Sequence, residues 1–371
     1  MAQTLAPAAA STSKGVPNWL RWLIGIAIGV AFCWQSARSW PLGQLFGGQL
    51  MLGRDAAGDE AILLRLPAGA VAWSVALWAI AAYLSCLTLI HWLRVLRWKP
   101  LLDPYASVPI RVLNRVGAVG FMATVLLPIR MGELTRPLML ARQGSGHVPV
   151  PVGAGLGTIA IERVLDGLLV TGLLFVVLFE VHPDTLARHP GVQQGAWAAA
   201  AVFGTALGGL VATLVARDFT LRMTRLILGA VSKNLAEKVV DLVTHFVDGL
   251  AFLKSPWHVL QFVGLTVVYW GINGLGIWLF ARGFGVHMDV LGGYAMMACL
   301  VVGMMIPNPP GSMGIFWNFL LLPAGLYGVN EDAPRTIAFA LGLWLAQTAQ
   351  VTAFGAWGWW SDGRARRRLA G

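Results

Sequence analysis

The chain has 371 residues, of which 57% are hydrophobic and only 12% are charged. Because a soluble domain carries about 25% charged residues, this composition excludes an ordinary soluble protein and indicates a protein that lies in lipid. The net charge of +10 would suggest a nucleic-acid partner in a soluble chain. In a membrane protein, basic residues gather in cytoplasmic loops instead, so no nucleic-acid partner is predicted.

Apolar runs near the length of about 20 residues that spans a bilayer recur along the whole chain. The runs are Trp19–Ala37, Ala68–Leu93, Thr158–Phe179, Ala196–Ala216, Val259–Phe280, Val290–Ile306, Ile315–Tyr327 and Ile337–Trp360. They predict an all-α polytopic membrane protein. Residues 19–360 form one transmembrane domain in this interpretation, residues 1–18 a disordered cytoplasmic N-terminus and residues 361–371 a basic cytoplasmic tail.

Lysine and arginine are distributed unevenly over the predicted loops. They total 17 in one set of segments, 1–21, 94–111, 142–150, 217–256 and 361–371. They total 6 in the other set, 38–66, 181–194, 282–289 and 329–335. The positive-inside rule assigns the first set, and with it both termini, to the cytoplasm. Residues 38–66 become a polar outer loop, and the amphipathic segment 217–256 is expected to lie along the cytoplasmic membrane surface.

This topology requires two segments that enter the membrane and return to the same side. Residues 111–142 would do so from the cytoplasm and residues 289–328 from outside. Each contains a Pro-x-x-x-Gly sequence after an apolar run, and the predicted helix-breaking residues are Pro128, Gly132, Pro307, Pro310 and Gly311. The prediction is about six full transmembrane helices plus two reentrant broken-helix hairpins in an inverted repeat, an arrangement that places transporter binding sites near the middle of the membrane.

Seven charged residues fall at predicted membrane depth between residues 115 and 166. They are Arg115, Arg130, Glu133, Arg136, Glu162, Arg163 and Asp166. Each such charge costs at least about 2.5–3.5 kcal/mol at the centre of a membrane helix unless it finds a partner or water. One interpretation is that these residues only pair with one another and fix the packing of the first hairpin. The other is that free guanidinium donors receive an anionic headgroup, for which the planar arginine fork suits phosphate.

Three sequences resemble the lysylphosphatidylglycerol synthase transmembrane-region family, the flippase-like domain of bacterial and archaeal membrane proteins. They are LPIRMGELTRPLMLAR at 127–142, IERVLDGLL at 161–169 and IPNPPGSMGIF at 306–316, with the polar Asn114 upstream. The resemblance implies movement of a lipid headgroup between leaflets of a bacterial-type inner membrane. The sequence departs from the family at Trp317, where members often have a glutamate. No synthase domain follows in this sequence, so lysyl transfer is not expected.

The leading hypothesis is a flippase that moves a phosphate-bearing lipid, namely a phospholipid, an aminoacylated phospholipid or a polyprenyl-phosphate-linked lipid. Arg130 and Arg136 would bind phosphate, and Glu133, Glu162 and Asp166 would orient them or meet a basic headgroup. The remaining predicted substrate-binding residues are Asn114, Arg115, Arg163, Asn308 and Ser312.

Two alternatives stay open, a membrane-embedded enzyme that acts on a lipid phosphate and a scaffold for a lipid-synthesis complex. The seven histidines are scattered, so no metal site, cofactor or catalytic motif is predicted. The expected partners are the lipid substrate and a separately encoded lipid-modifying enzyme, and a homo-oligomer is compatible with the sequence.

Overall fold

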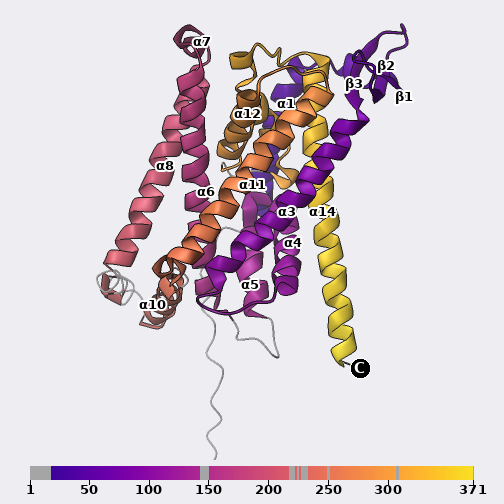
Figure 1. Ribbon diagram of the computed structural model, residues 1–371. Coiled ribbons are helices and arrows are strands. Elements are labelled where there is room, and N and C mark those ends of the chain that lie inside the picture. The colour runs from indigo at the N-terminus through magenta and orange to yellow at the C-terminus, as the bar shows by residue number, and fades with distance from the viewer. Residues whose placement is uncertain are drawn as a thin grey trace, which may run out of the picture.

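The structure is a computed structural model that describes residues 18–142, 150–216, 222–223, 225–226, 233–248, 251–305 and 309–370. Helices make up most of these residues (Figure 1). The α-helices are α1 (Asn18–Ser39), α2 (Leu42–Phe46), α3 (Leu77–Leu102), α4 (Ile110–Leu126), α5 (Thr135–Ala141), α6 (Val152–Glu180), α7 (Pro183–Arg188), α8 (Pro190–Val215), α10 (Lys233–Asp248), α11 (Pro256–Gly283), α12 (Val290–Gly303), α13 (Ile315–Leu321) and α14 (Pro334–Ala370). Shorter 3₁₀ helices are η1 (Pro128–Leu134), η2 (Ala251–Lys254), η3 (Pro310–Ser312) and η4 (Ala324–Tyr327).

Within the described residues, four helices are long and apolar enough to cross a membrane. They are Leu77–Leu102, Pro190–Ala212, Pro256–Gly283 and Pro334–Ser361. Helix α6 is also long, with 29 residues, but it carries Glu162, Arg163 and Asp166 inside its apolar sequence. These helices make the chain an integral membrane protein, as its composition predicts.

The prediction of a purely helical chain misses a small antiparallel sheet of strand order β1-β2-β3. Its strands are β1 (Gln49–Arg54), β2 (Glu60–Arg65) and β3 (Val71–Ala76). Two tight turns with left-handed glycines, Gly58 (φ +89°) and Gly69 (φ +88°), connect them. Part of the predicted polar outer loop 38–66 is therefore folded. Residues 71–76 of the apolar run Ala68–Leu93 belong to β3, because β-branched and aromatic residues favour a pleated surface.

Helix α3 begins at Leu77, later than the apolar run, and continues to Leu102. Arg94 and Arg97, counted in the predicted loop 94–111, are therefore residues of a membrane helix. This is a correction to the sequence interpretation, and its reason is that apolar residues continue the helix past Leu93, while Arg97 finds its counter-charges on α6. At the other end of the chain, α14 continues to Ala370, so the predicted basic tail prolongs that helix.

The predicted helix break after α4 is confirmed at Pro128, where η1 interrupts the helix and α5 follows with only 7 residues. Gly132 is required there because a Cβ at this position would overlap the backbone of Thr124. In the second broken segment, η3 contains Gly311 in the left-handed region (φ +70°) between α12 and α13. Pro307 and Asn308 lie outside the described residues, as do residues 1–17 and most of 217–232.

The two broken segments occupy opposite halves of the molecule (Figure 1). Helices α4 and α5 lie in the half that contains the end of α14, whereas α12 lies in the half that contains α7 and the sheet. The long helices α3 and α11 run side by side between these halves. Helix α6 packs against α3, α5 and α12, and this position brings its charged residues to the middle of the structure.

Candidate functional site

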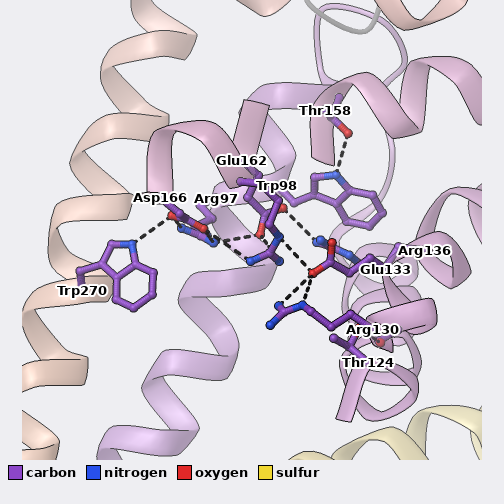
Figure 2. A network of polar contacts seen from close by, with 12 residues as sticks. Arg97, Trp98, Thr124, Arg130, Glu133, Arg136, Thr158, Glu162, Asp166 and Trp270 are labelled. Atoms are coloured by element: carbon purple, nitrogen blue, oxygen red, sulfur yellow. Dashed lines mark hydrogen bonds and ion pairs between the residues drawn. The ribbon is translucent and has the colours of Figure 1, made fainter. Parts of the chain in front are cut away.

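The centre of the site is an arginine from α3 held by two carboxylates from α6 (Figure 2). Glu162 and Asp166 lie four residues apart on one helix face, as predicted, and both are buried. The Arg97 Nη2 donates to Glu162 Oε1 at 2.9 Å and to Asp166 Oδ2 at 2.7 Å. The indole of Trp270 in α11 also donates to Asp166 Oδ1 at 3.0 Å. Three long helices are thereby connected through one buried carboxylate.

A second arginine approaches Glu162 from the broken helix. Arg136 of α5 donates from Nη1 to Glu162 Oε2 at 3.0 Å, and the arginine is only 1% exposed. Its stem passes Gly120 of α4, where a Cβ would overlap it. The neighbouring Trp98 donates to Thr158 Oγ1 at 3.1 Å. Glu162 therefore accepts from arginines of α3 and α5 at once, which fixes the short return helix on α6.

The third carboxylate, Glu133 in η1, pairs with arginines on two elements. Arg130 Nη2 lies 2.9 Å from Glu133 Oε1, and Arg163 Nε of α6 lies 3.4 Å from the same oxygen. Arg130 also donates from Nη1 to the carbonyl oxygen of Met304 at 2.9 Å, directly after α12. Its backbone is in the left-handed region (φ +53°), which is costly for a residue with a Cβ. This contact joins the first break to the end of α12.

These charges border a cavity of about 400 Å³, called here the central cavity. Its charged lining residues are Arg94, Arg130, Glu133, Arg163 and Asp166, and its uncharged polar ones include Asn273 and Gln347. The rest of the lining is largely apolar and includes Phe203, Ile277, Met297, Leu300 and Phe316. Few polar groups in a mostly apolar pocket are typical of sites for small molecules and lipids.

Arg94 differs from the other arginines at the central cavity. Its guanidinium lies 3.8 Å from the centre of the Phe121 ring. It makes no hydrogen bond or ion pair with any residue that the structure describes. A cation held over an aromatic face keeps its charge available, so Arg94 is the arginine best placed to accept an anionic ligand.

The structure brings some of the predicted site residues together and separates others. Arg130, Glu133, Arg163 and Asp166 line the central cavity, while Arg136 and Glu162 are buried behind it. Asn114 and Arg115 line a different cavity between α3, α4 and α14. Ser312 is buried in η3 and is not one of the residues that line the central cavity, and Asn308 lies outside the described part of the chain.

Sequence reasoning missed Arg94, Arg97 and Trp270. The two arginines share one face of α3 at a spacing of three, directly after an apolar run. The acids of α6 need basic partners at membrane depth. Two arginines on one helix face next to an apolar run could therefore have been identified as those partners. Trp270 lies in the middle of its helix rather than at an interface, and a buried indole N–H needs an acceptor.

The described residues hold no group of three or more His, Cys, Asp or Glu that could bind a metal ion. The arrangement of paired carboxylates, arginines in excess and an apolar wall is suited to holding an anion with an apolar attachment.

In a comparison with protein families, the family model described as the lysylphosphatidylglycerol synthase TM region matches residues 22–355 of the chain. This range includes every residue of the central cavity. No curated protein and no solved structure matches the chain.

Proposed function

Because the chain belongs to the lysylphosphatidylglycerol synthase TM region family, a membrane protein related to lipid metabolism or transport, we propose that it moves a phosphate-bearing lipid between the two leaflets. The headgroup would pass through the central cavity while the acyl chains stay in the surrounding lipid. The observation that carries this proposal is the excess of arginines over carboxylates at a cavity whose lining is otherwise largely apolar.

The charged cluster holds five arginines and three carboxylates, which leaves two positive charges without a counter-charge. The arginines are Arg94, Arg97, Arg130, Arg136 and Arg163, and the carboxylates are Glu133, Glu162 and Asp166. An uncompensated charge away from water is costly. A phosphate group of one or two negative charges would neutralise this excess, whereas a cationic ligand without phosphate would increase it.

The arginines divide into two groups by their contacts. Arg97 and Arg136 are almost fully buried and committed to Glu162 and Asp166, so they hold the scaffold. Arg94, Arg130 and Arg163 line the central cavity. In this division Arg94 binds the phosphate first, because it has no carboxylate to leave. Arg163 assists, since its ion pairs of 3.4–4.0 Å are longer than those of Arg97.

The apolar part of the lining favours a phosphate that is attached to a lipid over a soluble phosphate. Met297, Leu300 and Met304 from α12 and its end line the cavity together with Phe203 and Ile277. Methionine is flexible and fits irregular apolar groups. The cavity can therefore hold the glycerol region and the first methylenes of an acyl chain beside the phosphate.

The fold supports this proposal through its two broken segments. In our interpretation, α4–η1–α5 is a reentrant hairpin that enters from the cytoplasm, and α12 to α13 is its inverted counterpart. Their breaks meet at the hydrogen bond from Arg130 to Met304. With α1 and α6 added to the four apolar helices, six helices cross a bacterial-type inner membrane and both termini are cytoplasmic. Transport then consists of opening the central cavity first at one hairpin and then at the other, with no chemical step.

A liposome assay tests the proposal. The purified chain is reconstituted with fluorescent phosphatidylglycerol, and translocation is measured as the fraction of label that an added reductant reaches. Arg94→Gln should slow translocation at least tenfold, while Arg94→Lys should keep part of it. Arg282→Gln is the matched control, because Arg282 also lies over an aromatic ring, 5.1 Å from the Trp278 centroid, but outside the central cavity.

Equal rates for Arg94→Gln and Arg282→Gln would refute the assignment of the phosphate to Arg94. A wild-type protein that does not translocate lipid but returns a chemically altered lipid would show an enzyme instead. Both outcomes are read from the same liposomes, the second by mass spectrometry of the extracted lipid.

A further inference from the structure

A second cavity lies apart from the central one. It has a volume of about 640 Å³ and is formed by α3, α4 and α14, so it is called here the α4–α14 cavity. It shares no lining residue with the central cavity. Helix α14 approaches α4 closely at Gly355 and Gly358, where added Cβ atoms would meet Met122 and Ala118. The cavity borders this contact, toward the start of α4.

Helix α4 supplies three side chains with hydrogen-bond donors to the lining of the α4–α14 cavity. Arg111, Asn114 and Arg115 lie three and four residues apart and share one helix face. Arg111 is exposed and makes no hydrogen bond or ion pair with any described residue. None of the residues that line this cavity is Asp or Glu. The lining is therefore positive without an acid of its own.

A buried histidine fixes how Asn114 faces the cavity. The ring nitrogen Nε2 of His91 lies 2.9 Å from Asn114 Oδ1. Because a carbonyl oxygen only accepts, His91 must donate this hydrogen bond. The acceptor of Asn114 is then occupied, and its NH₂ group remains to donate. This arrangement adds a neutral donor beside the arginines and removes the acceptor that would repel an anion.

The remaining wall of the α4–α14 cavity is aromatic and faces outward. Trp92 is 44% exposed and Trp357 is 66% exposed, and Phe354 is a third aromatic residue of the lining. Exposed tryptophans on membrane helices are typical of the headgroup region of a bilayer. A ligand with its anion at Arg111 would therefore have its apolar part against these rings.

We infer that the α4–α14 cavity is a second phosphate site, which holds the phosphate of a membrane lipid against Arg111 and Asn114 while α14 and its aromatic residues contact the lipid chains. The shared chemistry is a phosphate anion, which a lipid headgroup or free phosphate could supply, and the aromatic wall favours the lipid. The inference does not depend on transport, because no residue of the central cavity takes part. A lipid held there would link α14 to α4.

Native mass spectrometry of the full chain in detergent micelles tests this site. The protein is titrated with phosphatidylglycerol, with diacylglycerol, which lacks phosphate, and with inorganic phosphate as competitor. Arg111→Gln removes the exposed guanidinium. Arg335→Gln is the matched control, because Arg335 is also an exposed arginine at the second residue of a helix, but at the start of α14, away from the cavity. Each variant is measured alone and with Arg94→Gln, which separates this site from the central cavity.

The expected result is a loss of phosphatidylglycerol affinity of about tenfold in Arg111→Gln and less than twofold in Arg335→Gln, also in the Arg94→Gln background. Ala353→Phe, which fills the cavity from α14, should reduce lipid retention in the same way. Displacement of the lipid by millimolar inorganic phosphate would identify free phosphate as the source, and resistance to it would identify the lipid. Equal affinities in Arg111→Gln and Arg335→Gln, or equal retention of diacylglycerol, would overturn the inference.

Discussion

Replacing Arg97 by methionine should destabilise the protein much more than the same replacement at Lys99 in the same helix. Methionine keeps a long apolar stem but removes the three hydrogen bonds that the Arg97 guanidinium donates to the two acids of α6. Asp166 would keep only the Trp270 indole at 3.0 Å and Arg163 at 4.0 Å. Glu162 would keep Arg136 at 3.0 Å and Arg163 at 3.6 Å. The change therefore leaves Asp166 as the poorly compensated buried charge.

The size of the expected loss in stability follows from the partners that the two acids keep. Removing one partner of a buried ion pair costs about 3–5 kcal/mol. The unfolded state in a membrane also finds partners for polar groups, which lowers such costs. We therefore expect the free energy of unfolding to fall by about 3 kcal/mol. A double-mutant cycle with Asp166→Asn should give a coupling energy of about 1–3 kcal/mol, because residues in one ion-pair network are not additive.

Unfolding in mixed micelles, followed by tryptophan fluorescence, measures both values. Lys99→Met is the control in the same helix, since its ion pair with Asp103 spans 2.6 Å but the lysine side chain is 40% exposed. Exposed pairs contribute about 0.2–1 kcal/mol. The reasoning fails if Arg97→Met and Lys99→Met lower the free energy of unfolding by the same amount. It also fails if the effects of Arg97→Met and Asp166→Asn on that free energy are additive.

Two further changes examine the same buried network. Trp270→Phe removes one donor to Asp166 and should lower the free energy of unfolding by about 1–2 kcal/mol, whereas Trp257→Phe, at a tryptophan that is 64% exposed, should change it little; equal losses in micelle unfolding would contradict the role of the indole. Gly120→Ala should displace the Arg136 stem and lower the thermal stability, while Gly172→Ala, on a face with open space, should be neutral or slightly stabilising; a harmless Gly120→Ala would mean that Arg136 can move without cost.

Much of the helical frame could be predicted because lipid imposes a simple rule on sequence. Apolar length located the long helices, and Pro128 located the first break, since proline removes a backbone donor that no water could replace. The i, i+4 spacing of Glu162 and Asp166 correctly placed both on one face. These features depend on local sequence alone.

What the sequence could not supply depends on contacts between distant residues. Arg97 counts as a loop residue in a charge inventory, and only its partners on α6, 65 and 69 residues away, identify it as buried. Asn114 and Arg115 lie near the network in sequence, but the direction of their helix face takes them to another cavity. The sheet was missed because its apolar strand β3 continues without a break into α3, so composition alone gives no boundary.

The surplus of two positive charges at the central cavity has a consequence for energy conversion. If the empty cavity opens alternately to the two sides of the membrane, each return without lipid carries this charge through part of the transmembrane electric field. A full crossing is worth about 2.3 kcal/mol per charge per 100 mV. When the cytoplasm is electrically negative, the voltage would therefore favour the empty state that is open to the cytoplasm. A cavity neutralised by a dianionic headgroup would change sides without electrical work. The membrane voltage alone could then set the direction in which the lipid moves.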